Sequence, residues 1–336
     1  VDLNRAGVPL AEIVSGPDLR SPQEARDYLR ALKQVLLYLG VSDCNMEEGS
    51  LRVDANVSVR PAGSTTLGTK TEVKNVNSFA YVEKALTVER DRQVAALEAG
   101  GRVEQETMLY DAKTNTARPQ RSKEESHDYR YFPDPDLPPL ILAPEFIEEQ
   151  QRDMPELPAA KRSRFTAQYA LNAYDAGVLT DTREVADYFE AVVTAGPEAK
   201  AAANWIMTEV LADSKSHNGS LRVPAGTVAR LLSLVKGGTV SHQAAKRVFD
   251  ELAARGGGDP HAIAEGLGLI QVTDANAVAG WVEEVMQAHP AEAARYRSGE
   301  TKLMAFFMGQ VMKQSKGKAD PKAAQRLLEE RLSPPS

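Results

Sequence analysis

The chain has 336 residues, 42% of them hydrophobic and 26% charged, which are ordinary proportions for a globular protein with two or three domains. Its formal net charge of −7 argues against a wholly basic nucleic-acid coat, although a local basic patch stays compatible with it. The single cysteine, Cys44, excludes an intramolecular disulfide and a cysteine-based zinc site, and we expect it to be a small buried residue. No apolar run has the length of a membrane span and no secretory leader is evident, so we expect a cytoplasmic protein.

The first 150 residues predict mixed α and β structure, beginning with a helix over residues 21–40. Ser21 is a good N-cap, Pro22 suits the first helical position, and Glu24 completes a capping box. Gly40 is expected to end the helix. The apolar stripe of this helix consists of Ala25, Leu29, Leu32, Leu36 and Leu39.

The stretch MEEGSLRVDANVSVR (46–60) alternates from Leu51 onward and predicts a strand with two unlike faces. The apolar face holds Leu51, Val53, Ala55, Val57 and Val59. The polar face holds Ser50, Arg52, Asp54, Asn56, Ser58 and Arg60, and we expect it to extend back in register to Glu48.

A turn-rich connection at 61–68 leads to a second, antiparallel strand predicted at 69–76. Asn77 or Ser78 then caps a helix that runs to Gly100-Gly101. Short strands are expected near 102–110 and 116–121, and the proline-rich segment 127–142 should be extended.

After about residue 150 the strand signals fade and helices dominate. Helices are predicted at 158–170, 181–195, 198–213, 224–236, 241–255, 273–289, 301–314 and 321–332. The glycines of GGGDP (256–260) predict a hinge. Trp205 and Trp281 are expected to be core residues rather than base-stacking platforms.

The polar face of the 46–60 strand raises two interpretations. Carboxylate and amide oxygens such as those of Asp54 and Asn56 are ligands for Mg²⁺, and arginine suits phosphate, so one interpretation is a phosphate-plus-magnesium site. The other is a solvated sheet face with ordinary ion pairs. No P-loop, Rossmann glycine pattern or kinase signature is present. Nearby polar residues are Glu47, Glu48, Glu72, Lys74, Asn75, Asn77, His127, Asp128, Tyr129 and Arg130.

Four long motifs resemble the GatB family, which supplies one of the subunits of the tRNA-dependent amidotransferases. They read DLNRAGVPLAEIVSGPDLRSP, GVSDCNMEEGSLRVDANVSVRP, EVKNVNSFAYVEKA and HDYRYFPDPDLPPL, and they occur in the order of the family. The end of the chain, 302–332, resembles the YqeY-type tail of the same family. The resemblance covers nearly the whole chain.

The resemblance implies an α+β fold: an antiparallel-sheet cradle over 1–150, an all-α helical domain over 151–267, and a small helical YqeY-like tail that binds tRNA over 268–336. It also implies an activity, in which ATP and Mg²⁺ are used to phosphorylate the side-chain carboxylate of Glu-tRNA(Gln) or Asp-tRNA(Asn). Ammonia from a GatA partner then forms Gln-tRNA(Gln) or Asn-tRNA(Asn), with a small GatC subunit completing a heterotrimer. The alternative is a non-catalytic subunit that only presents tRNA.

On the same resemblance, Asp54 and Glu48, with Glu47, are expected metal ligands. Arg52 and Lys74 would neutralise phosphate or carboxylate, and Asn56 and Asn75 would orient the acyl group or a ligand water. His127 and Arg130 complete the expected catalytic set. The family motifs that precede DLNRAG and supply further metal ligands do not precede Val1, so we expect an incomplete metal site.

The tail differs in charge from the rest of the chain. Residues 301–332 contain seven basic and three acidic residues, on a chain that is otherwise acidic. MKQSKGK (312–318) should place Lys313, Lys316 and Lys318 on a loop between helices. These lysines are expected to contact the tRNA backbone, the alternative being an exposed solubilising loop.

Overall fold

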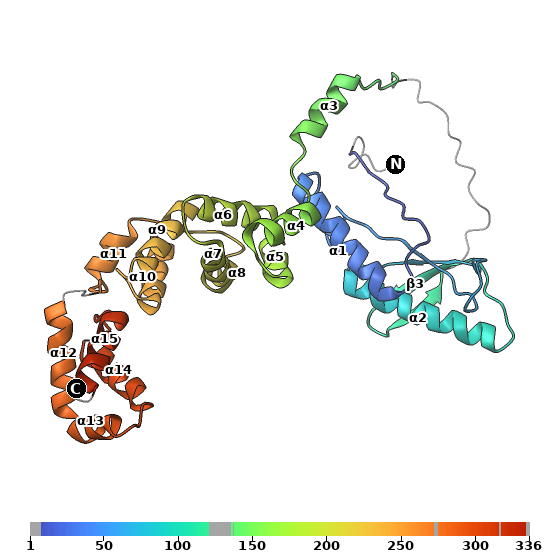
Figure 1. The fold of residues 1–336 in the computed structure, drawn as a ribbon. Coiled ribbons are helices and arrows are strands. Elements are labelled where there is room, and N and C mark those ends of the chain that lie inside the picture. The colour runs from blue at the N-terminus through green and yellow to red at the C-terminus, as the bar shows by residue number, and fades with distance from the viewer. Residues whose placement is uncertain (1–7, 121–135, 137, 272–274, 316, 334–336) are drawn as a thin grey trace. The chain divides into compact units, whose positions relative to one another are not determined.

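The computed structural model describes residues 8–120, 136, 138–271, 275–315 and 317–333, and the positions expected for His127, Arg130 and Lys316 lie outside these ranges. Two compact units are present, Val1–Pro158 and Ala159–Ser336 (Figure 1). Within the described residues, no helix is both long and apolar enough to cross a membrane.

The first unit is built on a four-stranded sheet with the order β1-β2-β3-β4. The strands are β1 (Ala55–Val57), β2 (Thr71–Lys74), β3 (Thr107–Asp111) and β4 (Thr116–Pro119). The outer pairs are antiparallel, but β2 and β3 run parallel, so the expectation of an antiparallel sheet is wrong for the central pair. Helix α2 (Phe79–Glu98) connects β2 to β3, and a crossover of this kind brings the second strand back parallel to the first.

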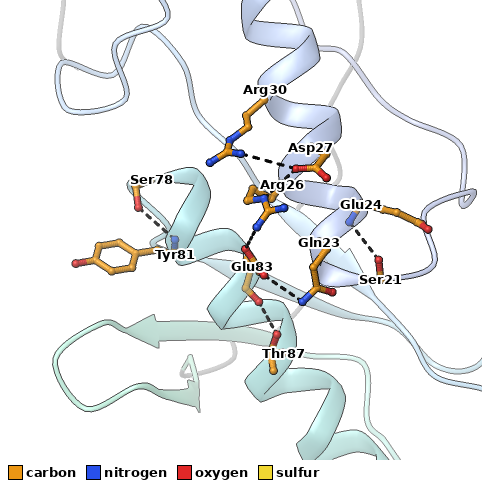
Figure 2. Close-up of polar contacts among 10 residues, drawn as sticks. All are labelled: Ser21, Gln23, Glu24, Arg26, Asp27, Arg30, Ser78, Tyr81, Glu83 and Thr87. Atoms are coloured by element: carbon orange, nitrogen blue, oxygen red, sulfur yellow. Dashed lines mark hydrogen bonds and ion pairs between the residues drawn. The ribbon is translucent and has the colours of Figure 1, made fainter. Parts of the chain in front are cut away.

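Helices α1 (Pro22–Leu39) and α2 begin at the predicted caps. Ser21 Oγ accepts from the Glu24 amide at 3.1 Å, and Ser78 Oγ accepts from the Tyr81 amide at 3.2 Å (Figure 2). Gly40 ends α1 at a φ of 68°, a left-handed conformation that glycine adopts without a Cβ clash.

The two helices are joined by a polar clamp around Glu83 of α2. Arg26 Nη1 donates to Glu83 Oε2 at 2.7 Å, and Gln23 Nε2 donates to Glu83 Oε1 at 3.0 Å (Figure 2). Because both donors lie on the first turns of α1, the clamp fixes that end of α1 against α2.

One face of the sheet is buried against these helices. The core there is formed by Leu29, Val73, Val76, Val82, Ala85, Leu86, Met108 and Tyr110, with Val53, Ala55 and Val57 packed against it. The predicted apolar face of the 51–57 stretch is therefore confirmed. Cys44 is also buried, as expected.

The chain continues with helices up to its last described residues. They are α3 (Pro144–Asp153), α4 (Pro158–Tyr169), α5 (Ala173–Leu179), α6 (Arg183–Thr194), α7 (Ala199–Trp205), the π-helix η2 (Ile206–Val210), α8 (Leu211–Ser216), α9 (Ala225–Lys236), α10 (His242–Arg255), α11 (Pro260–Gly266), α12 (Ala275–Ala288), α13 (Pro290–Arg297), α14 (Leu303–Gln314) and α15 (Pro321–Leu332). All eight predicted helices are present, although the one expected at 198–213 is interrupted by a π-helical turn.

The second unit contains two separate hydrophobic cores. We call the larger one the proximal core; it extends from Phe165 to Ile270 and includes Trp205, which is 2% exposed. The distal core is formed by helices α12 to α15, and Trp281 packs against it. Trp205 is thus a core residue, and the partly buried Trp281 packs against a core, in agreement with the prediction.

The predicted hinge at the glycines 256–258 is not a boundary between these cores. Gly256 ends α10 in a left-handed conformation, so the break itself is confirmed. However, Leu252 before it and Ile263 after it belong to the same proximal core. The change of core instead lies between Ile270 and Val278.

Candidate functional site

The polar face of the sheet carries the predicted site residues that β1 and β2 supply. Ala55 pairs with Val73 and Asn56 with Glu72, so continuing the register places Asp54 opposite Lys74. Residues at paired positions share a face, and Asp54, Asn56, Glu72 and Lys74 all lie on the side opposite the buried Val73. The sequence alternation thus predicted correctly that Asp54 and Asn56 share the polar face, and the strand pairing adds Glu72 and Lys74 to it.

Lys74 is the centre of the charged contacts on this face. Its Nζ lies 3.4 Å from Glu72 Oε2 and 3.9 Å from Asp54 Oδ2. Thr107 of β3 donates a 3.0 Å hydrogen bond to the same Glu72 oxygen. One ammonium therefore links carboxylates from two strands, and all three charged side chains remain between 32% and 58% exposed, open to an approaching ligand.

Glu47 and Glu48 do not extend the strand as expected. They lie in a turn over residues 46–49, where Asn45 Oδ1 accepts from the Glu47 and Glu48 amides at 3.0 and 3.4 Å. Gly49 follows with a φ of 81°. Because this turn interrupts the period-two alternation, shared strand parity no longer places Glu48 beside Asp54.

The remaining described residues of the predicted set lie near the same sheet. Arg52 and Asn56 are exposed on the polar side of the 51–57 stretch. Asn75 follows β2 with a φ of 67°, and its Nδ2 donates to the Tyr110 carbonyl at 2.9 Å. Asparagine tolerates this left-handed conformation, and the bond ties the end of β2 to β3. His127 and Arg130 lie outside the described residues.

The donor set for Mg²⁺ is incomplete in the part of the chain that the structure describes. There, no group of three or more histidine, cysteine, aspartate or glutamate side chains could hold a metal ion. Asp54 and Glu72 are the carboxylates that meet on the sheet, and the single ammonium of Lys74 offsets part of their charge. The described residues do not by themselves complete a magnesium centre.

A buried polar network on the opposite face of the sheet was missed by sequence reasoning. Glu89 of α2 is completely buried; its carboxylate accepts from Thr71 Oγ1 at 2.8 Å and from Gln93 Nε2 at 3.0 Å. Arg92 donates to both carboxylate oxygens at 2.8 Å. Gln93 Nε2 also lies 3.2 Å from the Val57 carbonyl, so the network joins α2 to both β1 and β2.

This network sets the charge state of Glu89. Burial raises the pKa of the carboxyl, but the hydrogen bonds from Arg92, Gln93 and Thr71 outweigh it and leave the pKa below its ordinary value. The sequence does contain a signal for the burial of Glu89. The helical spacing of Ala85, Glu89 and Gln93 places Glu89 on the apolar stripe of α2.

The structure describes two of the three predicted tail lysines. Lys313 is exposed in the last turn of α14, not in the loop as expected, and Lys318 is exposed after Gly317. Lys316 lies outside the described residues. A lysine in the last helical turn interacts favourably with the helix dipole.

Comparison with known protein families agrees with this architecture. The GatB/GatE catalytic domain family matches residues 1–148, which include the sheet and its polar face. The GatB domain family of the Yqey type matches residues 187–332. Together they define the class of the chain as a subunit of a tRNA-dependent amidotransferase.

Individual relatives are similar over almost the entire chain. The GatB subunit of the aspartyl/glutamyl-tRNA(Asn/Gln) amidotransferase of Nitrosococcus oceani is 51% identical over 337 residues, covering 99% of this chain and 70% of that protein. The corresponding subunits of Thermosynechococcus vestitus and Geotalea uraniireducens are 50% identical, covering 100% and 99% of this chain and 68% and 70% of those proteins. The chain belongs to the GatB family, as the sequence motifs indicated.

Proposed function

We propose that this subunit uses ATP and Mg²⁺ to activate the side-chain carboxylate of Glu-tRNA(Gln) or Asp-tRNA(Asn), which is then amidated. The observation that carries the proposal is the polar face, where Lys74 lies between Glu72 and Asp54 within the region that matches the GatB/GatE catalytic domain. The names of the relatives describe one subunit of an amidotransferase of aspartyl- and glutamyl-tRNA, which fits this chemistry.

The reaction requires two anions to meet, a carboxylate on the tRNA and the phosphates of ATP. A carboxylate is a poor acyl donor, and transfer of a phosphoryl group gives it a leaving group that ammonia displaces. Cationic side chains such as Lys74 and Arg52 would lower the repulsion between the anions. We assign Asn56 and Asn75 the role of orienting the acyl group, and His127 and Arg130 remain predictions.

We assign Asp54 as the carboxylate of this face that supports the reaction, with Glu47 and Glu48 as further predicted metal ligands. Because the described residues do not complete a magnesium centre, no step is assigned to the metal here. Asp54 is 58% exposed, so its removal should change chemistry at the face without disturbing the core.

We further propose that the work is divided along the chain. Residues 1–150 would carry the reaction, 151–267 would form a helical connector, and 268–336 would bind tRNA through Lys313, Lys316 and Lys318. GatA and GatC are the proposed partners, with GatA as the source of ammonia. The separate distal core of α12–α15 supports the idea of a distinct tail module.

The test uses the chain assembled with its partner subunits, Glu-tRNA(Gln), ATP and ammonium chloride. Free ammonia removes the dependence on glutamine hydrolysis, so the assay reports activation and amidation alone. We expect Asp54→Asn to reduce Gln-tRNA(Gln) formation by at least 100-fold, about 2.7 kcal/mol of transition-state stabilisation. Asp153→Asn, at an exposed position at the end of α3, is the matched control and should retain full activity.

Normal amidation by Asp54→Asn would show that Asp54 is not part of the reacting site. A wild-type assembly that binds misacylated tRNA but forms no amide with ATP and ammonia would instead favour the alternative, a subunit that only presents tRNA.

A further inference from the structure

The row of paired residues that contains Lys74 continues across the whole sheet. Lys74 of β2 pairs with Leu109 of β3, and Leu109 pairs with Arg118 of β4. Paired residues share a face, so Arg118 lies on the same face as Asp54 and Lys74. Two strand spacings separate the backbones of Lys74 and Arg118, roughly 10 Å.

Leu109 between these two cations is an exposed apolar residue. It is 38% exposed, whereas its neighbours in the strand, Met108 and Tyr110, are each 1% exposed on the buried face. An exposed leucine in the middle of a charged row offers an apolar floor to a ligand that is otherwise anionic.

The end of this row opens into a pocket of about 580 Å³. The pocket is lined by Asn75, Leu109, Tyr110, Asp111, Ala112, Lys113, Arg118 and Pro119. Asn75 is a residue of the predicted site, so the pocket adjoins that site directly. Lys74 is not among the lining residues, since its ammonium is directed toward Glu72 and Asp54.

The other charged residues of the pocket leave the guanidinium of Arg118 available to bind a ligand. Asp111 Oδ1 accepts from the Lys113 amide at 2.9 Å, so this carboxylate is held by the β3–β4 turn. That bond is the main cause of the lowered pKa of Asp111, to which the charge of Arg118 adds only a minor part. Among the residues that the structure describes, the Arg118 guanidinium forms no ion pair within 4 Å and no hydrogen bond. A planar guanidinium with five donors matches the oxygens of a phosphate group, and a charge-assisted contact of this kind is strong.

We propose that Arg118 binds a phosphate group of a nucleotide, with Leu109 and Pro119 as the apolar surface against which the nucleotide rests. The proposal rests on the function proposed above and adds to it a contact residue and a subsite at the β3–β4 end of the sheet. Two sources share this chemistry, the phosphates of ATP and the terminal nucleotide of the tRNA.

The test measures KM for ATP and KM for Glu-tRNA(Gln) separately in the complete assembly with ammonium chloride. Arg118→Gln should raise one of the two values about tenfold, the loss expected for one charge-assisted hydrogen bond. A rise confined to ATP identifies the nucleotide substrate, and a rise confined to the tRNA identifies its terminal phosphate. Arg118→Lys, which keeps the charge, should recover part of the affinity.

Arg102→Gln is the matched control, because Arg102 is 87% exposed and forms an ion pair with Glu104 outside the pocket. Leu109→Glu is a second variant, which places a carboxylate in the row and should raise the same KM as Arg118→Gln. Unchanged KM values in both pocket variants, or equal effects in the Arg102 control, would overturn the proposal.

Equilibrium binding of ADP to the assembly, measured by calorimetry, distinguishes a failure of the Arg118 subsite from a failure of the proposed function. If the wild type forms no amidated tRNA, the proposed function fails, whatever the Arg118 variant does. If the wild type is active and both KM values and the ADP affinity are unchanged in Arg118→Gln, the Arg118 subsite alone fails.

Discussion

Thr71 of β2 donates a 2.8 Å hydrogen bond to the completely buried carboxylate of Glu89, on the face of the sheet opposite Lys74. This bond makes the strand that carries Glu72 and Lys74 part of a network that includes α2. The polar face is therefore held in place by a buried hydrogen bond on the opposite face of the sheet.

We expect Glu89→Gln to destabilise this unit by about 1–3 kcal/mol, because Arg92 loses its buried partner and the hydrogen bonds from Thr71 lose their charge assistance. Hydrogen exchange of the β2 and α2 amides should report the loss locally. Asp91→Asn, at the exposed position two residues further along α2, should leave exchange unchanged. Equal exchange in wild type and Glu89→Gln would show that the network does not hold the strand.

The same residue predicts a dependence of stability on pH. The folded-state pKa of Glu89 is lower than its ordinary value of 4.5, so its ionised form stabilises the fold above that pH. This contribution should be lost as the pH falls from about 4.5 through the folded-state pKa. The free energy of unfolding, measured against pH, should fall less steeply in Glu89→Gln; identical slopes in both proteins would contradict the assignment.

The tail lysines predict a salt-dependent effect on tRNA. Replacing Lys313, Lys316 and Lys318 by alanine should weaken tRNA binding, raise KM for aminoacyl-tRNA and leave kcat near normal. The slope of log K against log salt should flatten by about one unit for each phosphate that the variant no longer neutralises. A control triple variant at the exposed Lys70, Lys215 and Lys236 should keep the wild-type slope. Unchanged affinity and slope in the tail variant would leave these lysines as a solubilising surface.

The two cores of the second unit should respond separately to truncation. Phe307 in the distal core and Phe249 in the proximal core are 0% and 3% exposed, and each change to alanine should cost about 3–5 kcal/mol. Hydrogen exchange should accelerate in α12–α15 for Phe307→Ala and in α9–α11 for Phe249→Ala. Acceleration across both cores in either variant would mean that they unfold together.

Local signals in the sequence predicted much of this fold. Ser21, Pro22 and Gly40 marked the ends of α1 because capping depends on a few neighbouring residues. The alternation at 51–57 likewise identified which side of the strand is buried. The short helices α5, α11 and α13 were missed, since seven or eight residues give too little periodicity to separate a helix from a loop.

Most of the features that sequence reasoning missed depend on contacts between distant segments. The parallel pairing of β2 and β3 follows from the path of α2. The sequence of a strand does not specify whether its neighbour runs parallel or antiparallel to it. Arg118 joins the row of Lys74 only through two strand pairings. The buried carboxylate of Glu89 accepts hydrogen bonds from Arg92, Gln93 and Thr71, and Thr71 lies 18 residues away. The turn at Glu47 and Glu48 reflects the side chain of Asn45, which a count of alternating residues does not detect.

The parallel pairing of β2 and β3 also sets an order for the formation of this sheet. During synthesis from the N-terminus, β1 and β2 can pair as an early hairpin, but an isolated two-stranded hairpin is only marginally stable. Glu72 and Thr107 are 35 residues apart, so their hydrogen bond forms only after α2 has been made and has crossed over. Because such non-local pairings are slow to form, we expect the pairing of β2 with β3 to be the rate-limiting step in the folding of this unit. The nascent chain would then keep β2 unpaired on one side until β3 has left the ribosome.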